Sequence, residues 1–172
     1  FRSGADRRTG AGVYDGAALT EAMSCADEEV YIVGGANSAG QAAMHFSRYA
    51  SKVHMLVRAE SLERSMSKYL IDQIQATPNI VVEPRTEVVE MSGDGHLECL
   101  MLKTPRGEEA RQASSLFIFI GAAPRTDWLP KELACDSKGF ILAGPELKAK
   151  SAASWSLARE PYLLETSVPG IF

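Results

Sequence analysis

The stretch Val30-Tyr31-Ile32-Val33-Gly34-Gly35-Ala36-Asn37-Ser38-Ala39-Gly40 decides the fold, because an apolar run ends in glycines and a helical pattern follows at once. Four apolar residues stopped by glycine predict a short buried strand. Apolar residues then recur at the i, i+3, i+4 and i+7 positions of an amphipathic helix, namely Ala39, Ala42, Ala43 and Phe46. The stretch therefore predicts a strand, a tight glycine turn and a helix in succession.

The same alternation continues along the chain. Residues 53–57 and 80–82 predict strands, and a helical stripe over residues 62–74 lies between them. Strands that alternate with helices predict a parallel sheet. Residues 86–91, 97–103 and 108–113 follow with turn sequences and no helix between them, which predicts an antiparallel meander. Residues 115–120 return as an apolar strand. The predicted fold is a Rossmann-like three-layer α/β domain, a parallel sheet with helices on one face and the meander on the other.

The glycine turn has the features of a phosphate-binding turn. A dinucleotide pyrophosphate binds the unpaired N–H groups at a helix N-terminus, and the turn before them must be tight. The fingerprint Gly-x-Gly-x-x-Gly/Ala matches residues 34–39 at its first and last positions, with alanine at the middle one. The residues predicted to contact the cofactor here are Gly34, Gly35, Ala36, Asn37, Ser38 and Ala39. A glycine-rich turn that binds nothing is the alternative.

Residues 35–40 also have the Gly-x-x-x-x-Gly spacing of the P-loop of nucleotide triphosphatases. A P-loop continues with lysine and then serine or threonine, but this chain has Gln41 and Ala42, so a nucleotide triphosphatase is excluded. NAD-specific sites carry an acidic residue after the second strand, but Arg58 stands there. A cation at this position favours the 2′-phosphate of NADP, and Arg64 is a second candidate for it. Glu60 and Glu63 lie between the two arginines and argue the other way.

Two further expectations concern the rest of the site. Ile120 and Gly121 end the last apolar strand and are predicted near the nicotinamide half of the cofactor, with an ordinary exit turn as an equal alternative. A short-chain dehydrogenase needs the motif Tyr-x-x-x-Lys, and no tyrosine of this chain is followed four residues later by lysine. No pair of a nucleophile and a base is recognisable either, so no catalytic residue is predicted.

The net charge, the apolar runs and the cysteines argue against several classes of partner and site. The net charge of −4 argues against nucleic acid, and no apolar run approaches the roughly 18 residues of a membrane-spanning helix. The three cysteines are far apart, with no Cys-x-x-Cys and no Cys/His cluster. They indicate neither a metal site nor a redox dithiol, and they suit a reducing, cytoplasmic setting.

Four segments together resemble the NADPH domain of thioredoxin-reductase-like flavoproteins, within the pyridine nucleotide-disulfide oxidoreductases. The resemblance is greatest to the branch often fused to a cyclic-nucleotide-binding domain. The segments are residues 29–43, 53–58, 65–70 (Ser-Met-Ser-Lys-Tyr-Leu) and 117–126. The resemblance implies that NADPH bound here passes a hydride to FAD. It also implies an NADPH domain over residues 29–126, a linker from a missing flavin domain over residues 1–28, and a linker with the start of the second flavin segment over residues 127–172.

The chain departs from that family at two places. The stretch that matches the family's Cys-x-x-Cys is Gly16-Ala17-Ala18-Leu19, and Ala59 replaces the second of two paired arginines. We therefore expect the NADPH-binding portion of a flavoprotein oxidoreductase without the usual redox dithiol, with FAD bound only in the full-length protein and the isolated chain inactive. The alternative is a binding-only NADPH-sensing or scaffold module. The expected partners are NADPH and the missing FAD-domain segments, and a homodimer is left open.

Overall fold

The computed structural model describes residues 12–15, 21–149 and 155–172. The chain divides into two compact units, Phe1–Ile120 and Gly121–Phe172. The stretch Gly16-Ala17-Ala18-Leu19 lies outside the described residues. Within the described residues, no helix has the length and apolar character needed to cross a bilayer.

A five-stranded parallel sheet forms the centre of the first unit. Its order is β1-β8-β2-β3-β4. The strands are β1 (Val13–Asp15), β2 (Glu29–Val33), β3 (Lys52–Val57), β4 (Ile80–Pro84) and β8 (Ser115–Ile118). The edge strand β1 lies within residues 1–28, where the sequence patterns had indicated no strand. Three residues are too few to show a periodic pattern, and β1 pairs with a strand about one hundred residues away, with Val13 opposite Leu116.

Two helices cover one face of this sheet. Helix α2 (Asn37–Phe46) follows the glycine turn as predicted, while α3 (Lys68–Ala76) begins six residues later than the stripe over residues 62–74 suggested. Ser67 has an extended backbone (φ −67°, ψ 143°) and precedes the first helical residue, so the helix cannot extend further back. Leu62 and Met66 are nevertheless buried, because the turn that carries them packs against α2.

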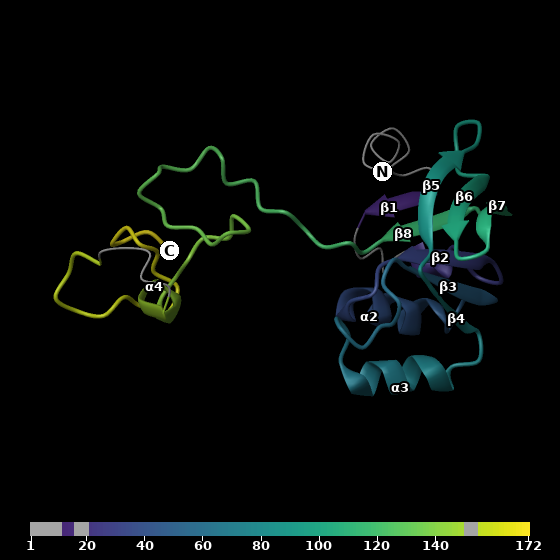
Figure 1. Ribbon diagram of the computed structural model, residues 1–172, viewed down its shortest axis with the longest axis horizontal. Coiled ribbons are helices and arrows are strands. Elements are labelled where there is room, and N and C mark those ends of the chain that lie inside the picture. The colour runs from purple at the N-terminus through teal and green to yellow at the C-terminus, as the bar shows by residue number, and fades with distance from the viewer. Residues whose placement is uncertain (1–11, 16–20, 150–154) are drawn as a thin grey trace. The chain divides into compact units, whose positions relative to one another are not determined.

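The opposite face carries the predicted antiparallel meander of β5 (Glu87–Ser92), β6 (Cys99–Thr104) and β7 (Gly107–Gln112). Figure 1 shows α2 and α3 on one side of the sheet and β5 to β7 on the other. Two apolar clusters fill the two interfaces. The helical one includes Phe46, Met55 and Phe117, and the other includes Leu56 and Leu100. The three-layer prediction is therefore confirmed.

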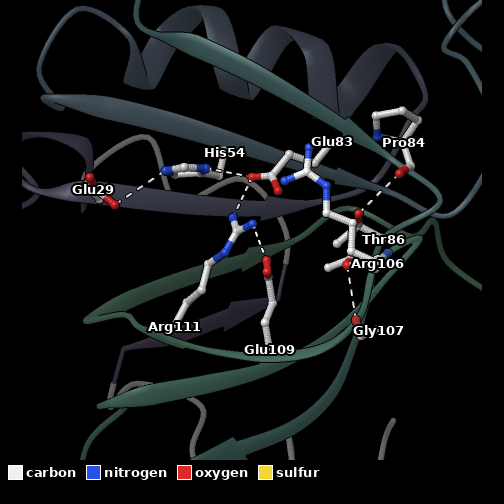
Figure 2. Close-up of polar contacts among 10 residues, drawn as sticks. Glu29, His54, Glu83, Pro84, Thr86, Arg106, Gly107, Glu109 and Arg111 are labelled. Carbon is white, nitrogen blue, oxygen red and sulfur yellow. Dashed lines mark hydrogen bonds and ion pairs between the residues drawn. The ribbon is translucent and has the colours of Figure 1, made fainter.

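A polar network also joins the meander to the parallel sheet (Figure 2). His54 Nδ1 on β3 and Arg111 Nη1 on β7 each lie 2.7 Å from the same oxygen of Glu83 on β4. Arg111 also pairs with Glu109. His54 Nε2 lies 3.3 Å from Glu29 Oε2 but makes no hydrogen bond among the described residues. Burial alone would raise the pKa of Glu83, but the hydrogen bonds from His54 and Arg111 outweigh it and lower the pKa to about 2.

The second unit has little regular structure apart from the short helix α4 (Pro145–Ala149). Its organising group is the carboxylate of Glu165, which is fully buried. Arg159 donates to both of its oxygens at 2.7 and 2.8 Å, and the backbone N–H groups of Tyr162 and Gly170 donate at 2.9 Å. The Glu165 carboxylate thus ties together residues 159–170.

Candidate functional site

The candidate site lies where the parallel strands end. All five strands of the sheet run the same way, so the turns that leave β2, β3, β4 and β8 meet at one edge. In open parallel sheets, ligands bind outside this carboxyl edge. The glycine turn after β2 and the loop of residues 58–67 after β3 both belong to it.

Gly34 and Gly35 allow the turn to pass close to its neighbours. Gly34 has a φ of +149°, and a Cβ there would lie 2.6 Å from the carbonyl oxygen of Phe119. A Cβ on Gly35 would lie 2.9 Å from Val57 Cγ1. The turn is thus confined between the exits of β8 and β3, and a side chain at Gly34 does not fit.

The N-terminus of α2 presents backbone donors to solvent. Ala36 is the N-cap residue, and no side chain caps the helix. The first intrahelical bond runs from the N–H of Gly40 to the carbonyl of Ala36 at 3.1 Å. The N–H groups of Asn37, Ser38 and Ala39 therefore have no acceptor within the helix. Ala36, Asn37 and Ser38 are exposed, whereas Ala39 is fully buried.

The side chain of Asn37 joins the glycine turn to the 58–67 loop. Its Oδ1 accepts hydrogen bonds from the backbone N–H of Ser67 at 2.8 Å and from the Ser67 hydroxyl at 3.1 Å. The Ser65 hydroxyl donates to the carbonyl of Gly35 at 2.8 Å. These bonds fasten the end of the 58–67 loop to the glycine turn. Sequence reasoning missed both serines, although a serine directly before a helix is an ordinary N-terminal signal.

Arg58 and Arg64 both lie on the 58–67 loop, and both are exposed. Neither forms an ion pair with another residue that the structure describes. A third arginine was missed by the sequence reading. Arg85 follows β4, its backbone N–H donates to the carbonyl of Ala59 at 3.0 Å, and its guanidinium lies 3.8 Å from Glu60. The loop after β3 thus carries two arginines of its own, and a third arginine from the end of β4 lies beside it.

Ile120 and Gly121 fall on either side of the boundary between the two units. Ile120 is exposed and follows Phe119, whose N–H donates to the carbonyl of Val33 at 2.8 Å. The exit of β8 therefore runs beside the glycine turn. Gly121 has a φ of +84° and begins the second unit, so its position relative to the turn is not defined.

Other chemistry is not visible in the part of the chain that the structure describes. No group of three or more His, Cys, Asp or Glu residues there is arranged to hold a metal ion. An open pocket of about 570 Å³ lies along α2 and α3; neither Gly34 nor Arg58 lines it, although Ser38 and Phe119 beside the glycine turn do. Its lining includes Ser38, Gln41, His45, Tyr69, Gln73 and Phe119. The strand edge, with its backbone donors and arginines, is the better candidate for an anionic ligand.

Comparison with known proteins identifies the family of the chain. A family model described as "Pyridine nucleotide-disulphide oxidoreductase" matches residues 9–154. A thioredoxin reductase of Pneumocystis jirovecii is 36% identical over 147 residues, which are 80% of this chain and 42% of that protein. A thioredoxin reductase of Chlamydia pneumoniae is 29% identical over 148 residues, 85% of this chain and 42% of that protein. The chain thus spans less than half the length of these relatives.

Solved structures share the fold. A crystal structure of T. acidophilum thioredoxin reductase superposes with a TM-score of 0.76 at 22% identity, covering 98% of this chain and 50% of that one. The thioredoxin reductase of Giardia duodenalis gives a TM-score of 0.69 at 24% identity, again over 98% and 50% of the two chains. At these identities the similarity shows the fold.

Proposed function

Because this chain belongs to the pyridine nucleotide-disulphide oxidoreductase family, we propose that it is the NADPH-binding portion of a flavoprotein oxidoreductase. The observation that carries the proposal is the uncapped N-terminus of α2, directly after a glycine turn that has no room for a side chain at Gly34. Exposed helix N–H groups behind a tight turn suit a pyrophosphate. The residues present therefore fit a dinucleotide.

Each part of the cofactor has a proposed set of contacts. The backbone of Gly34, Gly35 and Ala36 lets the pyrophosphate approach, and the N–H groups of Asn37, Ser38 and Ala39 donate to it. The exposed methyl group of Ala36 is small enough to leave this approach open.

The two loop arginines, Arg58 and Arg64, are proposed to bind the 2′-phosphate, since guanidinium groups pair well with phosphate oxygens. Ile120 is proposed to lie beside the nicotinamide half, because β8 ends next to the glycine turn. Gly121 is proposed there only from its position in the sequence, directly after Ile120.

The proposed reaction belongs to the cofactors. When bound, NADPH supplies a hydride to FAD, and this chain's residues hold and orient the dinucleotide. We propose that FAD is held by flavin-domain segments of the parent protein. The 172 residues contain no Cys-x-x-Cys, so disulfide reduction by that dithiol is not part of the proposal for this chain. Three free cysteines support a reducing compartment such as the cytoplasm.

The test is calorimetric titration of the protein with NADPH and with NADH. Arg58→Gln should weaken NADPH binding by roughly tenfold or more, the range of a lost charge-assisted hydrogen bond, and leave NADH binding unchanged. Arg106→Gln is the matched control, because Arg106 is an exposed arginine in the β6–β7 turn. Failure of the unsubstituted protein to bind either nucleotide would favour the scaffold alternative. Equal losses for both nucleotides would remove the 2′-phosphate role of Arg58.

A second measurement separates turnover from binding alone. In protein that carries its flavin, addition of NADPH under anaerobic conditions should bleach the oxidised flavin absorbance. Binding of NADPH without bleaching would favour the binding-only module.

A further inference from the structure

The 58–67 loop is held at its beginning as well as at its end. The N–H of Thr86 donates to the carbonyl of Val57 at 3.1 Å, and the N–H of Arg85 donates to the carbonyl of Ala59 at 3.0 Å. The chain that leaves β4 therefore runs beside the first residues of the loop. Arg85 is placed by its own backbone, independently of any ligand.

Arg85 also has an unusual backbone conformation. Its φ of +52° lies in the left-handed region, which glycine adopts freely and residues with a Cβ rarely do. An arginine at this position costs some conformational free energy, and backbone strain of this kind is concentrated at functional sites. The side chain is largely exposed, so it does not serve to fill the core.

The charges of the loop lie close to Arg85. Its two arginines, Arg58 and Arg64, are balanced by two acidic residues, Glu60 and Glu63. The guanidinium of Arg85 lies 3.8 Å from the carboxylate of Glu60, and it makes the local charge positive. A free carboxylate after the second strand is the feature that binds the ribose hydroxyls of NAD, and it repels a 2′-phosphate.

We propose that Arg85 is a positioning residue that sets the preference for NADPH over NADH by engaging Glu60. The pairing draws the Glu60 carboxylate toward the exit of β4 and offsets its charge, which leaves Arg58 and Arg64 to meet the 2′-phosphate. This inference rests on the proposed function, and it adds a residue from a third strand end to the nucleotide site. In this proposal a free Glu60 carboxylate would favour NADH, and the ion pair with Arg85 prevents that effect.

The test measures the dissociation constants of NADPH and NADH for five forms of the protein: the unsubstituted protein, Arg85→Gln, Arg85→Lys, Glu60→Gln, and Arg85→Gln combined with Glu60→Gln. Arg85→Gln should raise the constant for NADPH by about two- to fivefold, the range expected from an exposed ion pair, and should not raise the constant for NADH. Arg85→Lys should keep the NADPH preference, because it keeps the charge.

The double variant is the decisive one. Removing the Glu60 carboxylate should restore most of the preference that Arg85→Gln loses, while Glu60→Gln alone should change the preference much less; a purely structural role of Arg85 would give Glu60→Gln the same effect with and without Arg85. Arg106→Gln again controls for the loss of one exposed positive charge. An unchanged NADPH-to-NADH ratio in Arg85→Gln, or no rescue in the double variant, overturns the role of Arg85 while the proposed function stands. If the unsubstituted protein binds neither nucleotide, the proposed function fails, and the role of Arg85 fails with it.

Discussion

Arg111 Nη1 on β7 lies 2.7 Å from Glu83 Oε1 on β4, so a single carboxylate joins the antiparallel meander to the parallel sheet. The same oxygen lies 2.7 Å from His54 Nδ1, and the Glu83 side chain is mostly buried. Tyr31 stacks on His54 with ring centroids 4.7 Å apart. The pKa of Tyr31 is raised, chiefly by its burial. The Glu83 carboxylate thus lies beside apolar contacts between the sheet and the meander. The attraction between opposite charges is stronger there than at a fully exposed surface, because less water screens it.

Glu83→Gln should destabilise the first unit. The pKa of Glu83 falls from 4.5 to about 2 on folding, which corresponds to about 3 kcal/mol in favour of the charged, paired form. Glutamine keeps the size but leaves Arg111 and His54 without their anionic partner. Denaturant unfolding should show a loss of about 2–3 kcal/mol, while Glu90→Gln, at an exposed position of β5, should change the free energy of unfolding by less than about 0.5 kcal/mol. Equal effects would contradict the linking role of Glu83.

The same carboxylate predicts how stability depends on pH. Its folded-state pKa is depressed, so the stabilisation is fully present above the unfolded value of 4.5 and is lost as the pH falls toward about 2. The free energy of unfolding should therefore fall between about pH 5 and pH 2. Glu83→Gln should flatten this part of the profile. An identical slope in the variant would mean that other carboxylates account for the acid sensitivity.

Gly34→Ala should be costly for folding, independently of any ligand. The substitution combines a left-handed backbone with a Cβ that would lie 2.6 Å from the Phe119 carbonyl oxygen. We expect a loss of about 2–4 kcal/mol in the free energy of unfolding. Gly107→Ala is the matched control, since Gly107 has a φ of +124° but no atom within 4 Å of an added Cβ. It should lose only about 1 kcal/mol. A cost at Gly34 no larger than at Gly107 would mean that the turn can move away from β8.

Substitutions of Asn37 should separate its structural role from the electrostatics of the helix end. Asn37→Ala removes the acceptor of two hydrogen bonds from Ser67 and should cost about 1–2 kcal/mol of stability. Asn37→Asp keeps the acceptor and should retain the melting temperature. Its negative charge would lie beside the proposed pyrophosphate, so NADPH binding should weaken by roughly tenfold. A variant Asn37→Asp that binds NADPH normally would place the pyrophosphate elsewhere.

Much of the first unit could be predicted from local patterns. The apolar run before Gly34 and the helical stripe after it gave β2, the turn and α2, and two tight-turn sequences gave the meander of β5, β6 and β7. The start of α3 could not be read in this way. Leu62 and Met66 continue the apolar period of the helix, yet they are buried from a turn because Gly40 lets that turn approach α2. Periodicity reports which residues are buried, but not which backbone conformation buries them.

In the candidate site, too, some features follow from local sequence and others depend on tertiary contacts. Local spacing was enough to find the glycine turn and Arg58, since a fingerprint and the residue after the next strand lie within one strand–helix–strand unit. The other contacts of the candidate site depend on long-range packing. The contacts of Gly34 with Phe119, of Asn37 with Ser67 and of Arg85 with Ala59 and Glu60 join residues that are 25 to 85 positions apart. Such contacts leave no periodic trace in a sequence, because they depend on strand order and on the parallel alignment that brings several strand ends to one edge.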